Sequence, residues 1–141
     1  MNHITPYALW IGNAGDLRVL RSLFDREIRA VVQLAVEESA TSVPHEFILC
    51  RFPLLDGAGN DPELLTLAVK TVATLIDHGV PTLICCAHGL SRSPAIAAAA
   101  LSLVRKESPQ DCLNLVSARH AIDVSPGFWT ELVSVVQRVR Q

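Results

Sequence analysis

Short apolar runs that favour strands alternate along this chain with segments that have apolar residues at helical spacing. The clearest run covers residues 30–36 and is interrupted only by Gln33. Such a run is typical of a strand buried on both faces, because an exposed face requires polar residues at every second position. Other runs predict strands over residues 7–11, 46–51 and 81–85. Pro53 is expected to close the second of these. This alternation predicts an α/β fold with a central, mostly parallel sheet of four to five strands flanked by helices.

Five segments carry helical signals. The strongest follows Asp61-Pro62, which supplies an N-cap and a first-turn proline for a helix over residues 63–77. The buried face of this helix is expected to hold Leu64, Leu67, Ala68, Thr71, Val72 and Leu75. Asp16 and Ser125 are candidate N-caps of the first and last helices. The remaining helices are predicted over residues 16–24, 94–106, 110–118 and 126–138.

The composition limits the partners of the chain. Its 141 residues are 50% hydrophobic and 18% charged, which is typical of a folded chain, and we expect residues 1–141 to form a single domain. The formal net charge of -2 gives no general attraction for nucleic acid or an anionic membrane. Any anion must therefore bind at a local site. Nothing in the sequence requires more than a monomer.

The spacing of the cysteines fits neither a disulfide framework nor a zinc site. Cys50 and Cys112 are isolated, while Cys85 and Cys86 are adjacent. The first residues contain no basic stretch followed by a long apolar run, and no apolar segment reaches the roughly 18 residues of a membrane span. We therefore expect a cytoplasmic protein with reduced thiols and no bound metal.

The segment from Cys86 to Ser93 lies between the predicted strand 81–85 and a helix that begins with proline. A short loop that turns into a helix start points several backbone N–H groups inward and forms an anion-binding nest. The helix dipole adds roughly half a positive charge. Gly89 allows a backbone conformation that a side chain would hinder. We expect an anion to be held by Arg92 and by the loop residues Ala87, His88, Gly89, Leu90 and Ser91.

Cys86 stands at the mouth of this loop. Amide dipoles, a helix N-terminus and a guanidinium lower the pKa of a thiol from about 8.5 to about 3.5–7.5, so we expect Cys86 to be a thiolate that attacks phosphorus. Arg92 offers a planar fork of donors that matches phosphate oxygens. Ser93 is expected to donate a hydrogen bond to the sulfur and to help it leave. Each residue alone has a purely structural explanation, but their combination in a strand–loop–helix context favours function.

This segment resembles the Cys-x5-Arg signature of the cysteine-dependent phosphatases, with the glycine, the arginine and the following serine all matching. The whole chain resembles their compact, atypical dual-specificity branch: residues 6–13 are similar to its opening strand, 28–35 to its second strand, and 125–128 to the start of its last helix. The resemblance implies the dual-specificity phosphatase fold, a phosphocysteine intermediate and no cofactor. The implied substrates are phosphotyrosine and phosphoserine or phosphothreonine in proteins, or another phosphomonoester.

The resemblance also implies a loop aspartic acid, upstream of the cysteine, that protonates the leaving oxygen. Asp56 fits this position, on a polar loop before a predicted helix. Asp61 is the alternative, although it already suits the N-cap of that helix. Gly57 and Gly59 are expected to let the loop move towards the substrate. After phosphoryl transfer, the same carboxylate could accept a proton from the attacking water.

One position departs from the family pattern. Cys85 replaces the histidine that usually precedes the nucleophile, and this motivates a second hypothesis, a non-catalytic phosphate-binding module. A third hypothesis is a rhodanese-like sulfurtransferase, which also carries cysteine in an anion-binding loop. His88 and Leu90 stand where phosphatases of inositol lipids tend to carry lysine, which favours a phosphoprotein or another soluble phosphoester. Arg119 and His120 are candidates for the border of the pocket.

Overall fold

Five strands form one sheet in the order β1-β2-β5-β3-β4. The structure, a computed structural model, describes residues 1–141. The strands are β1 (Asn2–His3), β2 (Leu9–Asn13), β3 (Ala30–Ala35), β4 (Ile48–Leu54) and β5 (Thr82–Cys86). Every pair is parallel except β1 with β2, which confirms the predicted α/β class and the mostly parallel sheet. Because β5 is the central strand, the loop after Cys86 leaves from the middle of the sheet.

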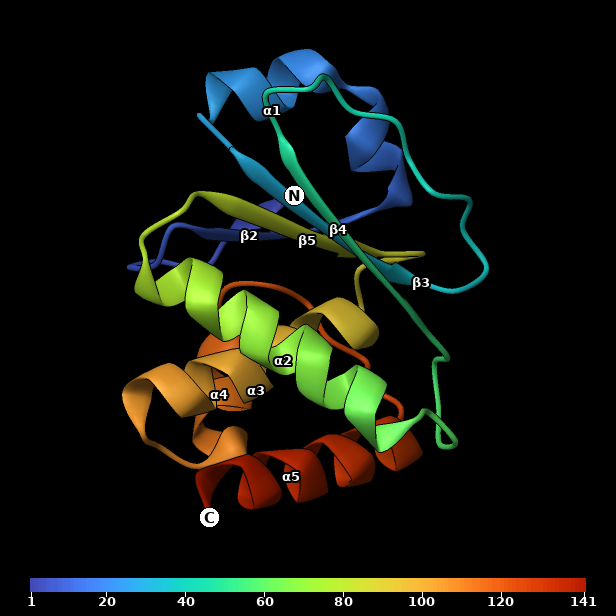
Figure 1. The fold of residues 1–141 in the computed structure, drawn as a ribbon. Coiled ribbons are helices and arrows are strands. Elements are labelled where there is room, and N and C mark those ends of the chain that lie inside the picture. Colours follow the sequence, from blue (N-terminus) through green and yellow to red (C-terminus); the bar gives the residue numbers. More distant parts are fainter.

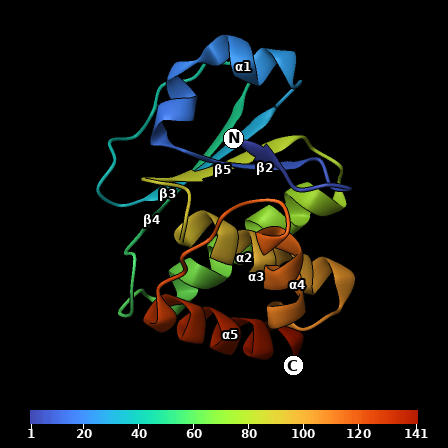
Figure 2. The same ribbon diagram turned by 180° about the vertical axis from the view of Figure 1, so that it is seen from behind.

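Helices cover both faces of the sheet (Figure 1 and Figure 2). One face carries α2 (Pro62–Asp77), α3 (Arg92–Arg105), α4 (Pro109–Ser117) and α5 (Pro126–Arg140). The other face carries two short helices, η1 (Ala14–Arg18) and α1 (Leu20–Asp25). None of the helices combines the length and the apolar character that a bilayer crossing requires.

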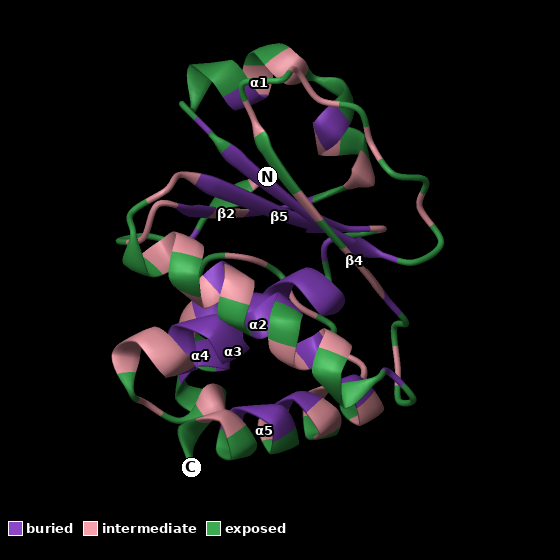
Figure 3. Ribbon diagram, in the orientation of Figure 1, coloured by how far each residue is buried: buried purple, intermediate pink, exposed green.

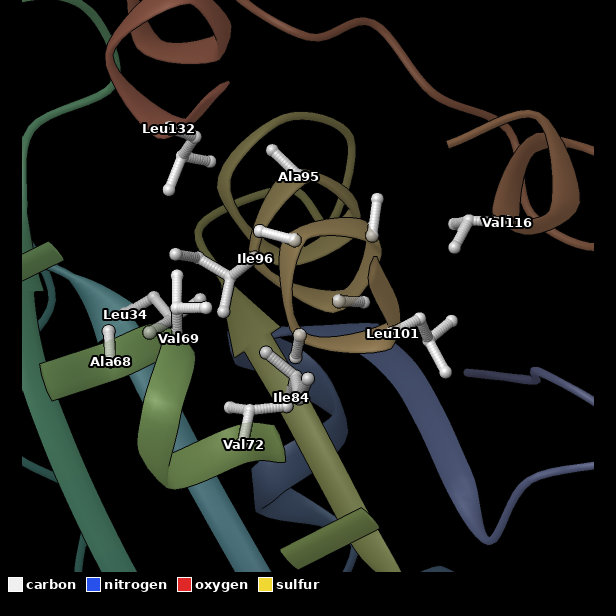
Figure 4. Close-up of a cluster of buried hydrophobic side chains, with 14 of the residues drawn as sticks. Leu34, Ala68, Val69, Val72, Ile84, Ala95, Ile96, Leu101, Val116 and Leu132 are labelled. Carbon is white, nitrogen blue, oxygen red and sulfur yellow. The ribbon is translucent and has the colours of Figure 1, made fainter. Parts of the chain in front are cut away.

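The alanine-rich helix α3 forms the centre of the larger core. Its residues 95–100 have no exposed surface, and α2, α4, α5 and β5 all contact it. Alanine side chains are small, so the neighbouring helices approach α3 closely. Figure 3 shows α3 buried along most of its length, and Figure 4 shows the apolar side chains gathered around Ile96 and Leu101. This packing fixes the position of the first turn of α3, where Arg92 lies.

The predicted buried face of α2 is confirmed in part, at Ala68 and Val72. Leu67, expected inside, is 57% exposed. The buried residues are Leu65, Ala68, Val69 and Val72. The sequence offers two overlapping apolar stripes on this helix, and packing against α3 and α5 selects the stripe that contains Leu65 and Val69. The predicted N-cap is confirmed, because the Asp61 carboxylate accepts a hydrogen bond from the Glu63 amide at 2.9 Å.

Two other boundaries were predicted wrongly. Residues 14–25 form two short helices, and Asn13, not Asp16, is the N-cap of the first. The side chain of Asn13 accepts a hydrogen bond from the Asp16 amide, and the Asp16 carboxylate accepts one from the Asn13 amide. β4 continues through Pro53 instead of ending before it. Since β4 is an edge strand, one side of its backbone has no neighbouring strand, and proline is tolerated there.

Candidate active site

The predicted nucleophile loop, residues 86–92, opens into a pocket of about 170 Å³. Cys86 is the last residue of β5 and is 3% exposed, so its side chain lies deep in this pocket. The residues that line the pocket are Asp56, Cys86, His88, Leu90, Ser91, Arg92 and Asp123. The pocket thus lies beyond the carboxyl end of a parallel strand, where ligands bind in folds of this class. It brings together most of the predicted site residues.

Gly89 meets two requirements of this loop. Its φ of +73° is in the left-handed region that residues with a side chain rarely adopt. A Cβ at this position would also lie 2.7 Å from the carbonyl oxygen of Gly12, at the end of β2. The loop therefore packs directly against the neighbouring strand, and only glycine fits this contact.

Arg92 is 3% exposed and is held by Glu37, a residue that the sequence did not indicate. Nη1 and Nη2 of Arg92 donate one hydrogen bond each to the two Glu37 carboxylate oxygens, both at 2.6 Å. Nη1 also donates to the carbonyl oxygen of Leu54 at 2.9 Å. These hydrogen bonds from Arg92 lower the pKa of Glu37 to about 2. Glu37 lies two residues beyond the end of β3, at the sheet edge where β5 also ends, and this position was the available signal in the sequence.

The first turn of α3 contains two buried polar atoms without a partner, Arg92 Nε and Ser93 Oγ. The expected hydrogen bond from Ser93 to the Cys86 sulfur is not formed. The helix boundary also differs from the prediction: α3 begins at Arg92 and not at Pro94, so Ser93 belongs to its first turn. The N-cap residue Ser91 makes no side-chain hydrogen bond to the first-turn amides of α3. Donors at this helix start are therefore available for an anion.

Asp56 reaches the pocket and is fixed there by two serines. Its Oδ1 accepts hydrogen bonds from Ser91 Oγ at 2.6 Å and from Ser125 Oγ at 2.8 Å. Both bonds end on Oδ1, so Oδ2 remains free to carry a proton. Ser125 is the N-cap residue of α5 by its backbone, as predicted, but its hydroxyl does not cap that helix. Asp61, the alternative acid, is engaged as the N-cap of α2 and does not line the pocket.

The segment between α4 and α5 covers the nucleophile loop. Nε2 of His120 lies 2.5 Å from the Gly89 carbonyl oxygen, and its Nδ1 lies 2.9 Å from Asn2 Nδ2. The amide of Asp123 donates to the Leu90 carbonyl oxygen at 2.7 Å, which places Asp123 in the pocket wall. His120, a candidate for the border of the pocket, contacts the loop but does not line the pocket, whereas Asp123 lines it and had no sequence signal. Arg119 instead donates to Thr5 Oγ1.

Cys85 points away from the site. Alternate residues of β5 face opposite sides of the sheet, so Cys86 belongs to the core under α3, while Cys85 packs with Leu17 and Val31 on the α1 side. Burial raises the pKa of Cys85 to about 12, which keeps its thiol protonated. Its sulfur donates a hydrogen bond to the Val32 carbonyl oxygen at 3.7 Å. The residue in the place of the family's histidine therefore makes no contribution to the pocket.

A larger pocket, of about 500 Å³, lies at the other end of the sheet, near Phe24, Phe47 and Pro81. It contains none of the predicted site residues. Its lining includes two carboxylates, Glu27 and Glu46, and one guanidinium, Arg29, but no cysteine, serine or histidine. Of these two pockets, only the smaller one is therefore lined by cysteine, serine and histidine side chains that were predicted for a site.

Comparisons with known proteins agree with the predicted fold. No family model and no curated protein matches the sequence. Among solved structures, human DUSP28 aligns with a TM-score of 0.86 and 20% identity, covering 99% of this chain and 98% of that one. A mouse putative dual specificity phosphatase complexed with zinc tungstate gives a TM-score of 0.85, 24% identity and coverage of 99% and 87%. A human tyrosine phosphatase-like serine/threonine/tyrosine-interacting protein gives a TM-score of 0.84, 19% identity and coverage of 100% and 98%.

The chain therefore has the fold of the compact dual-specificity phosphatases. This is the fold that the Cys-x5-Arg segment and the order of the flanking segments implied. The similarity extends to PTPMT1, solved in complex with PI(5)P, at a TM-score of 0.70 and 17% identity over 93% of this chain and 89% of that one.

Proposed function

We propose that this protein is a cysteine-dependent phosphatase that hydrolyses phosphomonoesters. In the first step, the Cys86 thiolate attacks phosphorus, the bond to the leaving oxygen breaks, and Asp56 gives its proton to that oxygen. In the second step, water attacks the phosphocysteine, the Asp56 carboxylate takes up a proton from it, and the sulfur leaves as a thiolate. Arg92 and the loop amides balance the charge of the phosphoryl oxygens in both steps.

The observation that carries this proposal is the unpaired Nε of Arg92. This donor is buried and has no hydrogen-bond partner, and Arg92 lines the same pocket as Cys86. A buried donor without a partner costs about 1–3 kcal/mol, and the fold tolerates this cost here. Glu37 holds the other two nitrogens and so fixes the plane of the guanidinium. A phosphoryl oxygen above Cys86 would give Nε the acceptor that it lacks.

The proposed substrate is a phosphorylated protein, with phosphotyrosine and phosphoserine or phosphothreonine as targets. Both Asp56 and Asp123 line the pocket, and the loop positions His88 and Leu90 carry no lysine. Such a wall disfavours ligands with several phosphate groups and favours a single phosphoester. We further propose that the protein is a cytoplasmic monomer that needs no cofactor.

The test is turnover of p-nitrophenyl phosphate by the purified chain and by the variant Cys86→Ser. We expect turnover by the wild type and none by the variant, while the control variant Cys50→Ser keeps wild-type activity, because Cys50 is partly exposed and lies outside the pocket. Mass spectrometry of the quenched wild-type reaction should show one phosphoryl group on Cys86. Absence of turnover, or turnover that Cys86→Ser retains, would refute the proposal.

The second candidate is a phosphate-binding module without turnover. It is favoured by Cys85, which faces away from the pocket and cannot perform the orienting role that the resemblance assigns to histidine. Calorimetry with inorganic phosphate separates the two candidates: binding without turnover supports the module, and binding with turnover supports the enzyme. Formation of thiocyanate from thiosulfate and cyanide would instead support the sulfurtransferase.

A further inference from the structure

The loop that carries Asp56, residues 55–61, lies against the beginning of α5 (Figure 1 and Figure 2). Asp56 is bonded to the N-cap residue of this helix through the Ser125 hydroxyl. Three residues further on, the amide of Gly59 donates a hydrogen bond to Glu131 Oε1 at 2.7 Å. The two contacts hold the loop at two separate points. We call this segment the acid loop.

Between these points, the acid loop packs against the helix backbone. A Cβ added to Gly127 would lie 3.1 Å from the Cβ of Ala58 and 3.2 Å from its amide nitrogen. A side chain at position 127 would therefore push the acid loop outward. The acid loop therefore rests on the first turns of α5.

Asn60 makes the acid loop a single unit. Its Oδ1 accepts a hydrogen bond from the Leu55 amide at 2.8 Å, and its Nδ2 donates to the Leu55 carbonyl oxygen at 3.0 Å and to that of Gly57 at 3.3 Å. Asn60 is only 9% exposed. Because one buried side chain joins both ends of the loop, a restraint on Gly59 also restrains Asp56.

The stability of the fold alone does not explain why a glutamate at position 131 makes the contact with Gly59. Oε2 of Glu131 is buried and has no hydrogen-bond partner. An unpaired buried carboxylate oxygen destabilises a folded protein. A smaller residue at position 131 would avoid this cost, at the expense of the bond to Gly59.

We propose that Glu131 is a positioning residue that holds the acid loop with Asp56 over the pocket before substrate binds. This proposal rests on the proposed function, because it assumes that Asp56 donates the proton. It also revises the expected role of the loop glycines. In this arrangement Gly59, with φ of +98°, shapes a loop that is already docked, and it does not act as a hinge that swings towards the substrate.

The test compares two substrates that differ in their need for a proton. Phenyl phosphate has a poor leaving group and needs general acid catalysis, whereas p-nitrophenyl phosphate has a good one and needs it less. For Glu131→Ala we expect kcat to fall about tenfold with phenyl phosphate and less than twofold with p-nitrophenyl phosphate. In Glu131→Ala, the fall of kcat on the alkaline side of the pH profile should be less steep with phenyl phosphate than in the wild type. Glu131→Gln keeps an acceptor for the Gly59 amide and should retain wild-type kcat.

A double-mutant cycle with Asp56→Asn gives the decisive result. If Glu131 acts only through Asp56, Glu131→Ala should cause no further loss of kcat in the Asp56→Asn background. Amide hydrogen exchange at Gly59 should be faster in Glu131→Ala, while the melting temperature stays within a few degrees of the wild type.

The outcomes separate this proposal from the proposed function. Wild-type turnover that requires Cys86, with no effect of Glu131→Ala on either substrate, would leave the phosphatase in place and overturn the positioning role. Equal losses for both substrates that persist without Asp56 would also overturn it, since they indicate a general structural effect. Failure of the wild type to turn over either substrate would overturn both.

Discussion

Replacing Glu37 by glutamine tests how the buried guanidinium of Arg92 is held. Glutamine has the same shape and keeps one acceptor for Arg92, but it carries no charge at any pH. Folding lowers the pKa of Glu37 from 4.5 to about 2. A group with a lowered pKa stabilises the folded state above its unfolded pKa and loses this contribution as the pH falls towards its folded pKa. The wild type should therefore lose part of its stability between pH ~4.5 and ~2.

The size of this contribution follows from the shift and from the exposure of the side chain. One pKa unit corresponds to about 1.4 kcal/mol, so the full shift would amount to roughly 3 kcal/mol for a group shielded from solvent. The Glu37 side chain is 51% exposed, and water screens its charge. We therefore expect Glu37→Gln to be less stable than the wild type by about 1 kcal/mol at pH 7. This difference should shrink progressively below pH ~4.5.

Urea unfolding at pH 7, 5, 4 and 3, followed by the fluorescence of Trp10 and Trp129, measures this difference. The matched control is Glu27→Gln, which removes an exposed carboxylate outside any ion pair and should leave the midpoint at pH 7 unchanged. A wild-type advantage over Glu37→Gln of equal size at pH 7 and pH 3 would refute the reasoning, because an uncharged contact would then account for it. Equal stability at pH 7 would refute it as well.

Three further predictions concern the site and the core. Asp56→Ala should lower kcat by roughly 10²–10⁴ while binding of inorganic phosphate survives, and an unchanged kcat would exclude Asp56 as the acid. Gly89→Ala should abolish phosphate binding in calorimetry, because the added Cβ would lie 2.7 Å from the Gly12 carbonyl oxygen at a φ of +73°; binding at wild-type affinity would contradict this. Ile96→Ala should destabilise the fold by about 2–5 kcal/mol in urea unfolding, since Ile96 is fully buried in α3, and a loss below about 1 kcal/mol would indicate that the core closes around the cavity.

The sequence was most informative where one short segment contains all the signals. The nucleophile loop is such a segment, because the strand, the glycine, the arginine and the helix start follow one another within residues 81–94. The start of α2 was predictable for the same reason, since Asp61 and Pro62 are neighbours that act on the same turn. Asp56 was identified through the family resemblance and not through the local pattern.

The missed features depend on residues that meet only in the folded chain. Glu37 reaches Arg92 across 55 positions, and Ser125 reaches Asp56 across 69. A serine before proline predicts the N-cap residue of a helix. The pattern does not tell whether the serine hydroxyl caps that helix or contacts another loop. The buried face of α2 was predicted only in part because its two apolar stripes overlap, and only contact with α3 and α5 decides between them.

The packing of α3 has a consequence for how substitutions affect the chain. The nucleophile loop leads into α3, the acid loop leads into α2 and rests on α5, and all three helices meet at the buried alanines of residues 95–100. A leucine in place of one of these buried alanines would need space that the packed core does not have, so the elements around α3 would have to shift. The relative positions of Cys86, Arg92 and Asp56 thus depend on a helix interface made largely of methyl groups.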